Sequence, residues 1–399
     1  MKFLRDALDK VKPNFEKGGK WEKFYYIYEA HETLLFVPNS TTNPKGVQIR
    51  DAVDMKRMMM TVIIAMVPCL LFGIWNAGHQ HFLATGQTGA LLDEIMIGAM
   101  LVVPIIAVSY TVGLGIEFTF ATIRRHDVNE GFLVSGMLIP LVMPASIPLW
   151  QVALATAFAV IIGKEVFGGT GFNILNVALT ARAFLYFAYP SQISGDVWSY
   201  LGDKTPVDGF SGATPLAKGP EVMASGESMV ASLDSFGAGW ADGIYSFWNM
   251  FMGIIPGSIG ETSTLMCLIG AAILIGTGVG SWKIILSVFL GAFVMGSFVN
   301  LVAVNEYMAL PAEYHLVIGG LAFGAVFMAS DPVTAAQTET GKWIYGFLVG
   351  VFTIIIRVFN PAYPEGIMLA ILLMNVFAPL IDYYVVAAHK KRRLKRATI

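Results

Sequence analysis

Charged residues are scarce in this sequence. Asp, Glu, Lys and Arg make up 14% of its 399 residues, whereas a soluble domain carries roughly 25%. Hydrophobic residues account for 55%, so the composition excludes an ordinary water-soluble protein and favours a chain that has lipid as its main solvent. The formal net charge of −2 provides no basic surface for binding nucleic acid, and we expect no such partner.

Metal and nucleotide signatures are also missing. Cysteine occurs twice, at Cys69 and Cys267, both inside apolar runs. Without a CxxC or Cys/His spacing, the pair predicts buried packing rather than an iron–sulfur or zinc site. The six histidines include no pair at i, i+4 spacing, so a bis-histidine haem is not expected. The glycine cluster GTGVG at 276–280 lies inside an apolar run, so it predicts no dinucleotide-binding site.

Long apolar runs dominate what is present. A spanning helix needs roughly 20 apolar residues, and the sequence predicts an all-α polytopic membrane protein with about ten transmembrane helices. The runs at 131–147 and 313–330 are short and rich in Gly, Ser or Pro, which predicts broken helices whose backbone is covered by protein or by a cavity. The ten predicted spans are 58–76, 95–121, 131–147, 149–163, 174–190, 262–280, 283–303, 313–330, 343–358 and 366–386.

Basic residues predict the orientation. Eleven Lys and Arg precede the first span, and six more lie in the tail HKKRRLKR. The apolar residues before the first span are too sparse for a secretory signal. The segment 191–261 holds two Lys against eight Asp and Glu. Because positive loops face the cytoplasm, we expect a multi-pass protein of the bacterial inner membrane with both termini in the cytoplasm and 191–261 in the periplasm.

The order of span types in spans one to five occurs again in spans six to ten. Because five is an odd number, the second half enters the membrane from the opposite side to the first. This arrangement is an inverted repeat of the transporter kind. The connectors KEVFGGTGFNILN and RVFNPAYPEG precede the last span of each half, and both open with a basic residue. The sequence therefore divides into five parts. They are a cytoplasmic amphipathic arm (1–57), a first five-helix repeat (58–190), a periplasmic loop (191–261), a second five-helix repeat (262–386) and a basic cytoplasmic tail (387–399).

The periplasmic segment contains the motif DGFSGAT at 208–214. Its glycines permit close backbone approach, and the motif presents the hydroxyl of Thr214. Such a hydroxyl can be acylated or phosphorylated when an enzyme delivers the group. By itself, the motif favours a structural turn, because small-residue loops are common.

This motif resembles the flavin-attachment site of two related membrane proteins. One is the flavin-carrying B subunit of the sodium-translocating NADH:quinone oxidoreductase, and the other is the D subunit of the ion-translocating ferredoxin:NAD oxidoreductase. The long N-terminal arm favours the former. The resemblance covers essentially the whole chain through the motifs NEGF at 129–132, KEVFGGTG at 164–171, PGSIGE at 256–261, SDP at 330–332 and NPAYPEG at 360–366.

The resemblance implies two flavins and a urea-channel-like fold. FMN would be joined by a phosphoester to Thr214, next to Ser211, Gly212 and Ala213, after delivery by a flavin transferase. Riboflavin would be bound noncovalently within the membrane part. The residues that we expect to neighbour the riboflavin are Gly168, Gly169, Asn173 and Arg182, although an ordinary hairpin would explain the glycines as well.

The resemblance also implies sites for quinone and sodium. Gly113 and Gly115 match the glycine region linked to quinone-site inhibitors, although Leu114 separates glycines that are adjacent in the family. Acids inside spans are costly and usually functional, and the expected sodium path involves Glu117, Asp331 and Asp382. The alternative role for these acids is to cap helix ends or to pair with Lys.

The resemblance therefore implies a subunit of a redox enzyme that lies in membrane lipid with the other subunits of the complex. Such a subunit would pass electrons from FMN through riboflavin to ubiquinone and couple this transfer to Na⁺ translocation. Two alternatives share the fold. One is the ferredoxin-linked relative, and the other is a channel or transporter that carries no flavin.

Overall fold

The structure is a computed structural model that describes residues 2–36, 45–46, 53–125, 127–128, 131–360 and 363–397. All regular elements in these ranges are helical. Six helices are long and apolar enough to cross a membrane. They are α3 (Met55–Ala84), α4 (Leu91–Arg124), α6 (Leu149–Gly163) continued by η3 (Glu165–Phe167), α12 (Trp282–Leu301), α15 (Glu339–Phe359) and α16 (Ile367–Ala397). The chain is therefore a polytopic, all-helical membrane protein in its described parts.

The remaining apolar runs form shorter helices. The runs at 131–147 and 313–330 were expected to be broken, whereas those at 174–190 and 262–280 were expected to be ordinary spans. Three of these are α5 (Gly131–Leu141), α7 (Val177–Ala188) and α11 (Thr264–Gly276). The run at 313–330 divides into α13 (Ala312–Val317), α14 (Leu321–Phe323) and the π-helical turn η6 (Gly324–Met328). The break between α13 and α14 contains Gly319 at φ +69°, a backbone conformation that glycine adopts at little cost.

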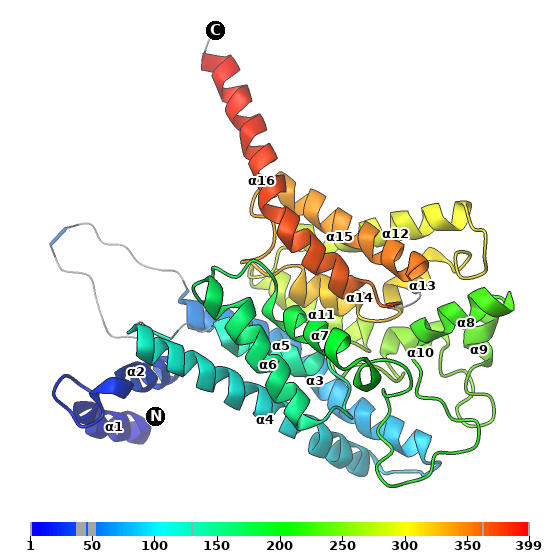
Figure 1. Ribbon diagram of the computed structural model, residues 1–399, viewed down its shortest axis with the longest axis horizontal. Coiled ribbons are helices and arrows are strands. Elements are labelled where there is room, and N and C mark those ends of the chain that lie inside the picture. The colour runs from blue at the N-terminus through cyan, green and yellow to red at the C-terminus, as the bar shows by residue number, and fades with distance from the viewer. Residues whose placement is uncertain are drawn as a thin grey trace.

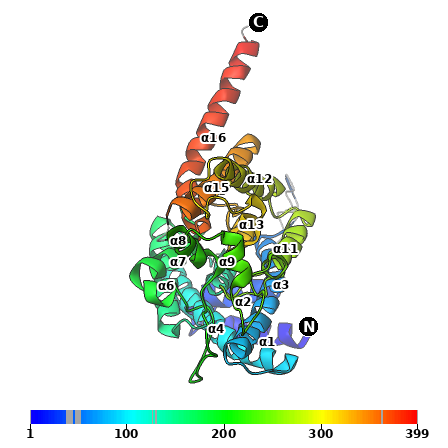
Figure 2. The ribbon, with the colours of Figure 1, turned by 90° about the vertical axis from the view of Figure 1, so that its right-hand side faces the viewer.

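The two halves of the chain occupy different regions. Helices α3–α7 gather in the lower part of both views, and α12–α16 gather in the upper part (Figures 1 and 2). The halves meet where α11 packs on α3 and where α16 approaches α7. The contacts between helices are alike in the two halves. In the first half, α4 packs on α5 and α6, and α6 packs on α7. In the second half, α12 packs on α13 and α15, and α15 packs on α16.

The segment 191–261 is more structured than a loop. After η4 (Pro190–Gln192), it forms η5 (Pro215–Ala217), α8 (Lys218–Ser225), α9 (Met229–Ser235) and α10 (Phe247–Met252). Buried Leu216, Leu233 and Tyr245 share one hydrophobic core with Val299 of α12 and Ile354 of α15. Because this core joins the segment to the second half, it fixes the position of the DGFSGAT motif.

Both ends of the chain carry basic helices. The arm folds into α1 (Lys2–Val11), η1 (Lys12–Asn14), η2 (Glu22–Phe24) and α2 (Tyr25–Leu35), and α2 contacts α4. The predicted boundary between the last span and the tail has no break, because α16 continues as one helix to Ala397. Lys and Arg favour this continuation, since they are good helix formers that suit a C-terminal helix end.

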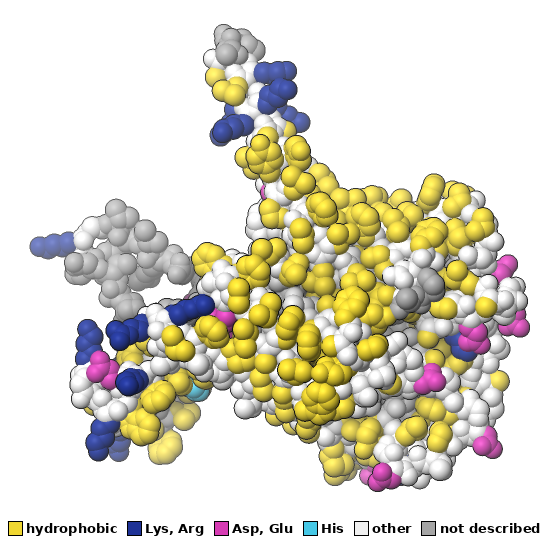
Figure 3. Space-filling view, viewed as in Figure 1, with side chains coloured by type: hydrophobic (Ala, Val, Ile, Leu, Met, Phe, Trp, Pro, Cys, Tyr) yellow, Lys and Arg dark blue, Asp and Glu magenta, His cyan; other side chains and the backbone are white. Residues whose placement is uncertain are grey.

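The charges are unevenly distributed. Figure 3 shows Lys and Arg gathered over the N-terminal helices and the far end of α16, whereas most visible Asp and Glu lie at the end that contains α8 and α9. The two cysteines are buried, with their sulfur atoms 3.8 Å apart between α3 and α11. Their expected packing role is confirmed.

Candidate functional site

The DGFSGAT motif folds as a closed turn. The Ser211 hydroxyl donates to Asp196 Oδ1 over 3.1 Å and accepts from the backbone N–H of Ala213 over 3.3 Å. A Cβ at Gly212 would lie 2.5 Å from the carbonyl oxygen of Asp196, so a side chain there would push the motif away from the Asp196 backbone. Gly209 supplies the positive φ, +79°, that reverses the chain. These contacts explain the small residues in the motif.

Thr214 follows this turn and begins η5. The hydroxyl of Tyr245 donates to the carbonyl oxygen of Ala213, and burial raises the pKa of Tyr245 well above its usual range, so this donor stays protonated. Thr214 itself is half-buried, and its hydroxyl makes no hydrogen bond with any residue that the structure describes. A fixed backbone therefore presents an available oxygen, which is the geometry that attachment of a phosphoester requires.

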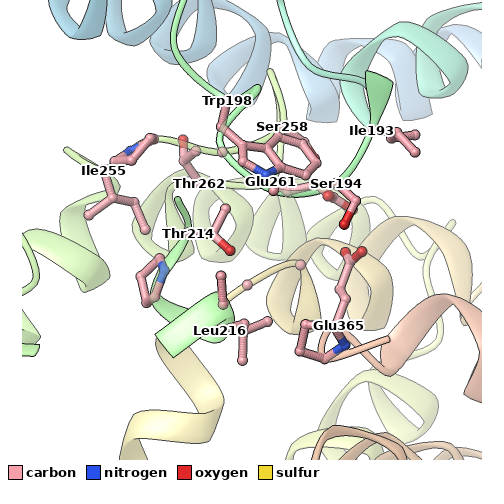
Figure 4. A pocket seen from close by; sticks show the side chains of 18 of the residues that line it. Ile193, Ser194, Trp198, Thr214, Leu216, Ile255, Ser258, Glu261, Thr262 and Glu365 are labelled. Atoms are coloured by element: carbon pink, nitrogen blue, oxygen red, sulfur yellow. The ribbon is translucent and has the colours of Figure 1, made fainter. Parts of the chain in front are cut away.

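Thr214 lines a cavity of about 100 Å³, shown in Figure 4 with Trp198, Ser258 and Glu365 around it. Arg182 of α7 lies in the cavity wall and donates to Glu261 and to Glu365, each over 2.6 Å. Arg182 also reaches Ser258 at 3.5 Å. The side chains of Arg182 and Glu261 are each 5% exposed. Arg182, Glu261 and Glu365 together carry a formal net charge of −1. Their two ion pairs link α7 to the segments that contain Glu261 and Glu365.

The lining of this first cavity fits the ring of a flavin. Trp198, Tyr186 and Tyr363 supply aromatic surface, and the last two rings meet edge to face at 4.4 Å. Flat aromatic groups bind well against such rings. The two carboxylates disfavour a phosphate deep in the cavity, whereas the hydroxyl of Thr214 would hold it on the side of the motif. The residues present are therefore compatible with FMN attached at Thr214.

A second cavity, of about 90 Å³, lies between the halves. Asn173 and Asn176 line it beside α7, and Lys164 and Asp331 line it from the first and second half. The side chain of Asn176 caps α7 by accepting from the N–H of Leu179 over 3.1 Å. Amide, ammonium and carboxylate groups facing one apolar cavity are the usual features of a small-molecule site. They would offer both donors and acceptors to the edge of a riboflavin ring.

The four residues expected around riboflavin do not all meet. Asn173 lies at the second cavity, but Arg182 lies at the first, beside Thr214. Gly168 and Gly169 line neither of these cavities. Their positive φ angles, +122° and +97°, fold the connector back so that the N–H of Gly169 donates to the carbonyl oxygen of Lys164 over 3.1 Å. These glycines therefore shape the connector and position Lys164.

Gly113 and Gly115 lie on different sides of α4. A Cβ at Gly113 would lie 1.8 Å from the ring of Phe132, whereas a Cβ at Gly115 would meet no atom within 4 Å. The intervening Leu114 lines a third, apolar cavity of about 70 Å³, together with Phe118 and with residues of α2 such as Leu34. A cavity of this kind between the arm and α4 suits an apolar ligand.

The three acids of the expected sodium path lie in three separate places. Glu117 is buried and pairs with Lys164. Asp331 accepts from the N–H of Val333 over 3.1 Å and from the hydroxyl of Thr334 over 2.9 Å. Asp382 accepts from the N–H groups of residues at the start of α15. Within the described ranges, no group of three or more His, Cys, Asp and Glu is placed to hold a metal ion.

Sequence reasoning did not select Glu261, Glu365 or Lys164 as site residues. Glu261, Glu365 and Lys164 lie in the motifs PGSIGE, NPAYPEG and KEVFGGTG, respectively. The signal that could have identified them as site residues is a charged residue next to a spanning helix. Two of the quoted motifs are only partly described, because residues 129–130 and 361–362 lie outside the described ranges.

Comparisons with known proteins agree with these features. The NQR2, RnfD, RnfE family matches residues 42–391. Proteins named as the B subunit of Na(+)-translocating NADH-quinone reductase are similar over 98% of this chain. The one from Stutzerimonas stutzeri is 47% identical, with 99% of its length covered, and those from Chromohalobacter salexigens and Ectopseudomonas mendocina are 46% and 48% identical, with 96% and 99% covered. The chain therefore belongs to the NQR2, RnfD, RnfE family, as its motifs indicated.

Proposed function

We propose that this chain is the flavin-carrying membrane subunit of a sodium-pumping NADH:quinone oxidoreductase. FMN is linked to Thr214, riboflavin occupies the second cavity, and ubiquinone binds at the third cavity, which is lined by Leu114 between Gly113 and Gly115. The observation that carries the proposal is the half-buried Thr214 hydroxyl at an aromatic cavity, held in place by the closed DGFSGAT turn. The names of the full-length relatives support the same assignment.

The helix α7 connects the two proposed flavin sites. Val177 at its beginning lines the second cavity, and Tyr186 near its end lines the first. At about 1.5 Å per residue, these two residues are separated by about 14 Å along the helix axis. Bound flavins supply the electron chemistry that side chains lack. The contribution of the chain is to hold two such groups at the ends of one short rigid helix.

The proposal includes an orientation in the inner membrane. Both termini face the cytoplasm, and 191–261 faces the periplasm, where the flavin transferase and a partner protein of the complex reach Thr214. The separation of basic and acidic residues supports this orientation (Figure 3). The matching helix pairs in the two halves support an inverted repeat of five helices each. NADH is oxidised on another subunit, and sodium passes near Glu117 and Asp331.

Two other functions fit some of these features. The ferredoxin-linked relative shares the family, and the electron donor that reduces isolated membranes, NADH or ferredoxin, distinguishes it. A channel without flavin would suit the broken helices, but it gives no reason for Thr214 to face an aromatic cavity.

Thr214→Ala is the direct test, and Thr205 offers a matched control. Both are threonines followed by proline in the same segment, but Thr205 is exposed and lies outside the motif. The protein is expressed with its flavin transferase, denatured, and examined for in-gel fluorescence and for a peptide mass increased by FMN.

Thr214→Ala should abolish both signals, Thr214→Ser should retain part of them, and Thr205→Ala should leave them unchanged. NADH oxidation by the partner protein should continue while electron flow to quinone fails. Fluorescence that survives denaturation in Thr214→Ala would refute FMN attachment at this residue.

A further inference from the structure

Lys164 lies between a carboxylate and the second cavity. It follows directly after α6, and its Nζ pairs with the carboxylate of Glu117 on α4. The two side chains are 3% and 4% exposed. Lys164 also lines the second cavity, and its Nζ stands 6.0 Å from the centroid of the Phe132 ring. One buried ammonium group thus borders both an acid and a ligand site.

The second half of the chain shows how a buried cation can be held differently. Arg357, near the end of α15, is fully buried and donates to the backbone carbonyls of Glu365, His315 and Ile318 over 2.6–2.8 Å. This guanidinium group is surrounded by fixed acceptors and bridges α13 to the connector before α16. Its role is structural.

Lys164 has a different environment. Among the described residues, the polar partner of its Nζ is the Glu117 carboxylate. An ammonium group has three donors, and a buried charge interacts strongly with other charges because the surroundings screen it weakly. A negative charge placed in the second cavity would therefore interact directly with Lys164 and would compete with Glu117 for it.

We propose that Lys164 stabilises the negative charge that a flavin ring in the second cavity takes up on reduction, and that Glu117 limits this stabilisation. The inference rests on the proposed function, which places riboflavin there and FMN as the electron donor. One electron transferred without a proton adds one negative charge to the ring, and Lys164 compensates for it without moving a proton. Asp331 faces the same cavity and opposes the added charge.

The measurement is the midpoint potential of the noncovalent flavin in the purified complex, followed by absorbance during an electrochemical titration. Lys164→Met removes the cation and should lower the potential. A tenfold loss of preference for the reduced ring equals about 59 mV for one electron. Glu117→Gln leaves the cation without its opposing charge and should raise the potential. Lys164→Arg keeps the charge and should stay close to the unchanged protein.

Lys342→Met is the matched control, because Lys342 pairs with Glu339 on the surface and lines neither flavin cavity. It should not shift the potential. Opposite shifts in Lys164→Met and Glu117→Gln would support the proposal, since a purely structural role predicts no such pair of signs. Shifts of the same sign, or none in either variant, would overturn it.

If Lys164→Met does not assemble, Glu117→Gln and Lys164→Arg decide the question: a rise in the first with none in the second supports the proposal, and no rise overturns it. A purified complex with no noncovalent flavin would refute the riboflavin assignment itself, which separates that failure from a failure of the Lys164 role.

Discussion

Arg182 of α7 donates a 2.6 Å hydrogen bond to Glu365, which stands just before α16, so an ion pair links the first half of the chain to the second. Glu261, just before α11, is the other partner of Arg182. One guanidinium group thus joins α7 to two connectors at the cavity that contains Thr214. The planar fork of arginine suits this arrangement, because it can serve two carboxylates at once.

Removing Arg182 should destabilise the protein strongly. Arg182→Ala leaves two carboxylates buried together, and breaking a buried pair typically costs about 3–5 kcal/mol. Thermal unfolding of the detergent-purified protein should begin at clearly lower temperature, and adding Glu261→Gln and Glu365→Gln to Arg182→Ala should recover part of the loss. Lys283→Ala, at an exposed pair with Glu339, should cause little change. A normal unfolding temperature for Arg182→Ala would show that this link is dispensable.

The two glycines of α4 should respond differently to alanine. Gly113→Ala places a methyl group against the ring of Phe132, which overpacks the contact and typically costs about 1–3 kcal/mol. Gly115→Ala enters open space and should keep or slightly raise stability, because Ala favours a helix more than Gly does. Combining Gly113→Ala with Phe132→Leu should restore part of the stability. Equal effects of the two single variants on unfolding and on inhibitor binding would contradict this account.

The contrast between these glycines shows a limit of sequence reasoning. Spacing places Gly113 and Glu117 on one face of a helix, but it does not reveal that Phe132 and Lys164 cover that face. Hydropathy predicted the helical class and the broken runs at 131–147 and 313–330 because these depend on local composition. The charge clusters depend on contacts between distant segments, so Arg182 was grouped with Asn173 although they line different cavities.

The segment 191–261 shows a second limit. Its low hydropathy predicted a loop, yet Leu216 and Tyr245 bury themselves against α12 and α15. Apolar residues spaced irregularly among glycines give no helical or strand period, so pattern analysis cannot detect such a core. The DGFSGAT motif was recognisable by resemblance alone, and its fixed position comes from this packing.

The proposed orientation can be tested with single cysteines. Lys204→Cys in the 191–261 segment and Lys391→Cys on α16 are both at exposed positions, whereas the native Cys69 and Cys267 are buried and should give little background. In intact cells, a maleimide that cannot cross the inner membrane should label the first variant only. Both should react after the membrane is disrupted. Labelling of both in cells with intact inner membranes would place the two positions on one side and reject the arrangement.

Asp331 and Asp382 provide a test of the sodium path, because the structure gives them different partners. Asp382 accepts from the N–H groups of Gln337 and Thr338 over 2.6 and 2.9 Å, at the beginning of α15. A carboxylate there stabilises a helix N-terminus. Asp331 instead follows the π-helical turn and faces the second cavity.

Asp382→Asn keeps one acceptor oxygen but removes a negative charge next to the N-terminus of α15. It should therefore lower stability by roughly 0.3–1 kcal/mol and leave the sodium dependence of quinone reduction unchanged. Asp331→Asn should raise the sodium concentration needed for half-maximal turnover. A tenfold rise corresponds to about 1.4 kcal/mol, a reasonable value for one charged ligand oxygen. Flavin content should stay normal in both variants, which separates ion binding from cofactor loss. The assignment fails if Asp382→Asn shifts the sodium dependence and Asp331→Asn does not, because the cavity carboxylate would then have no part in the ion path.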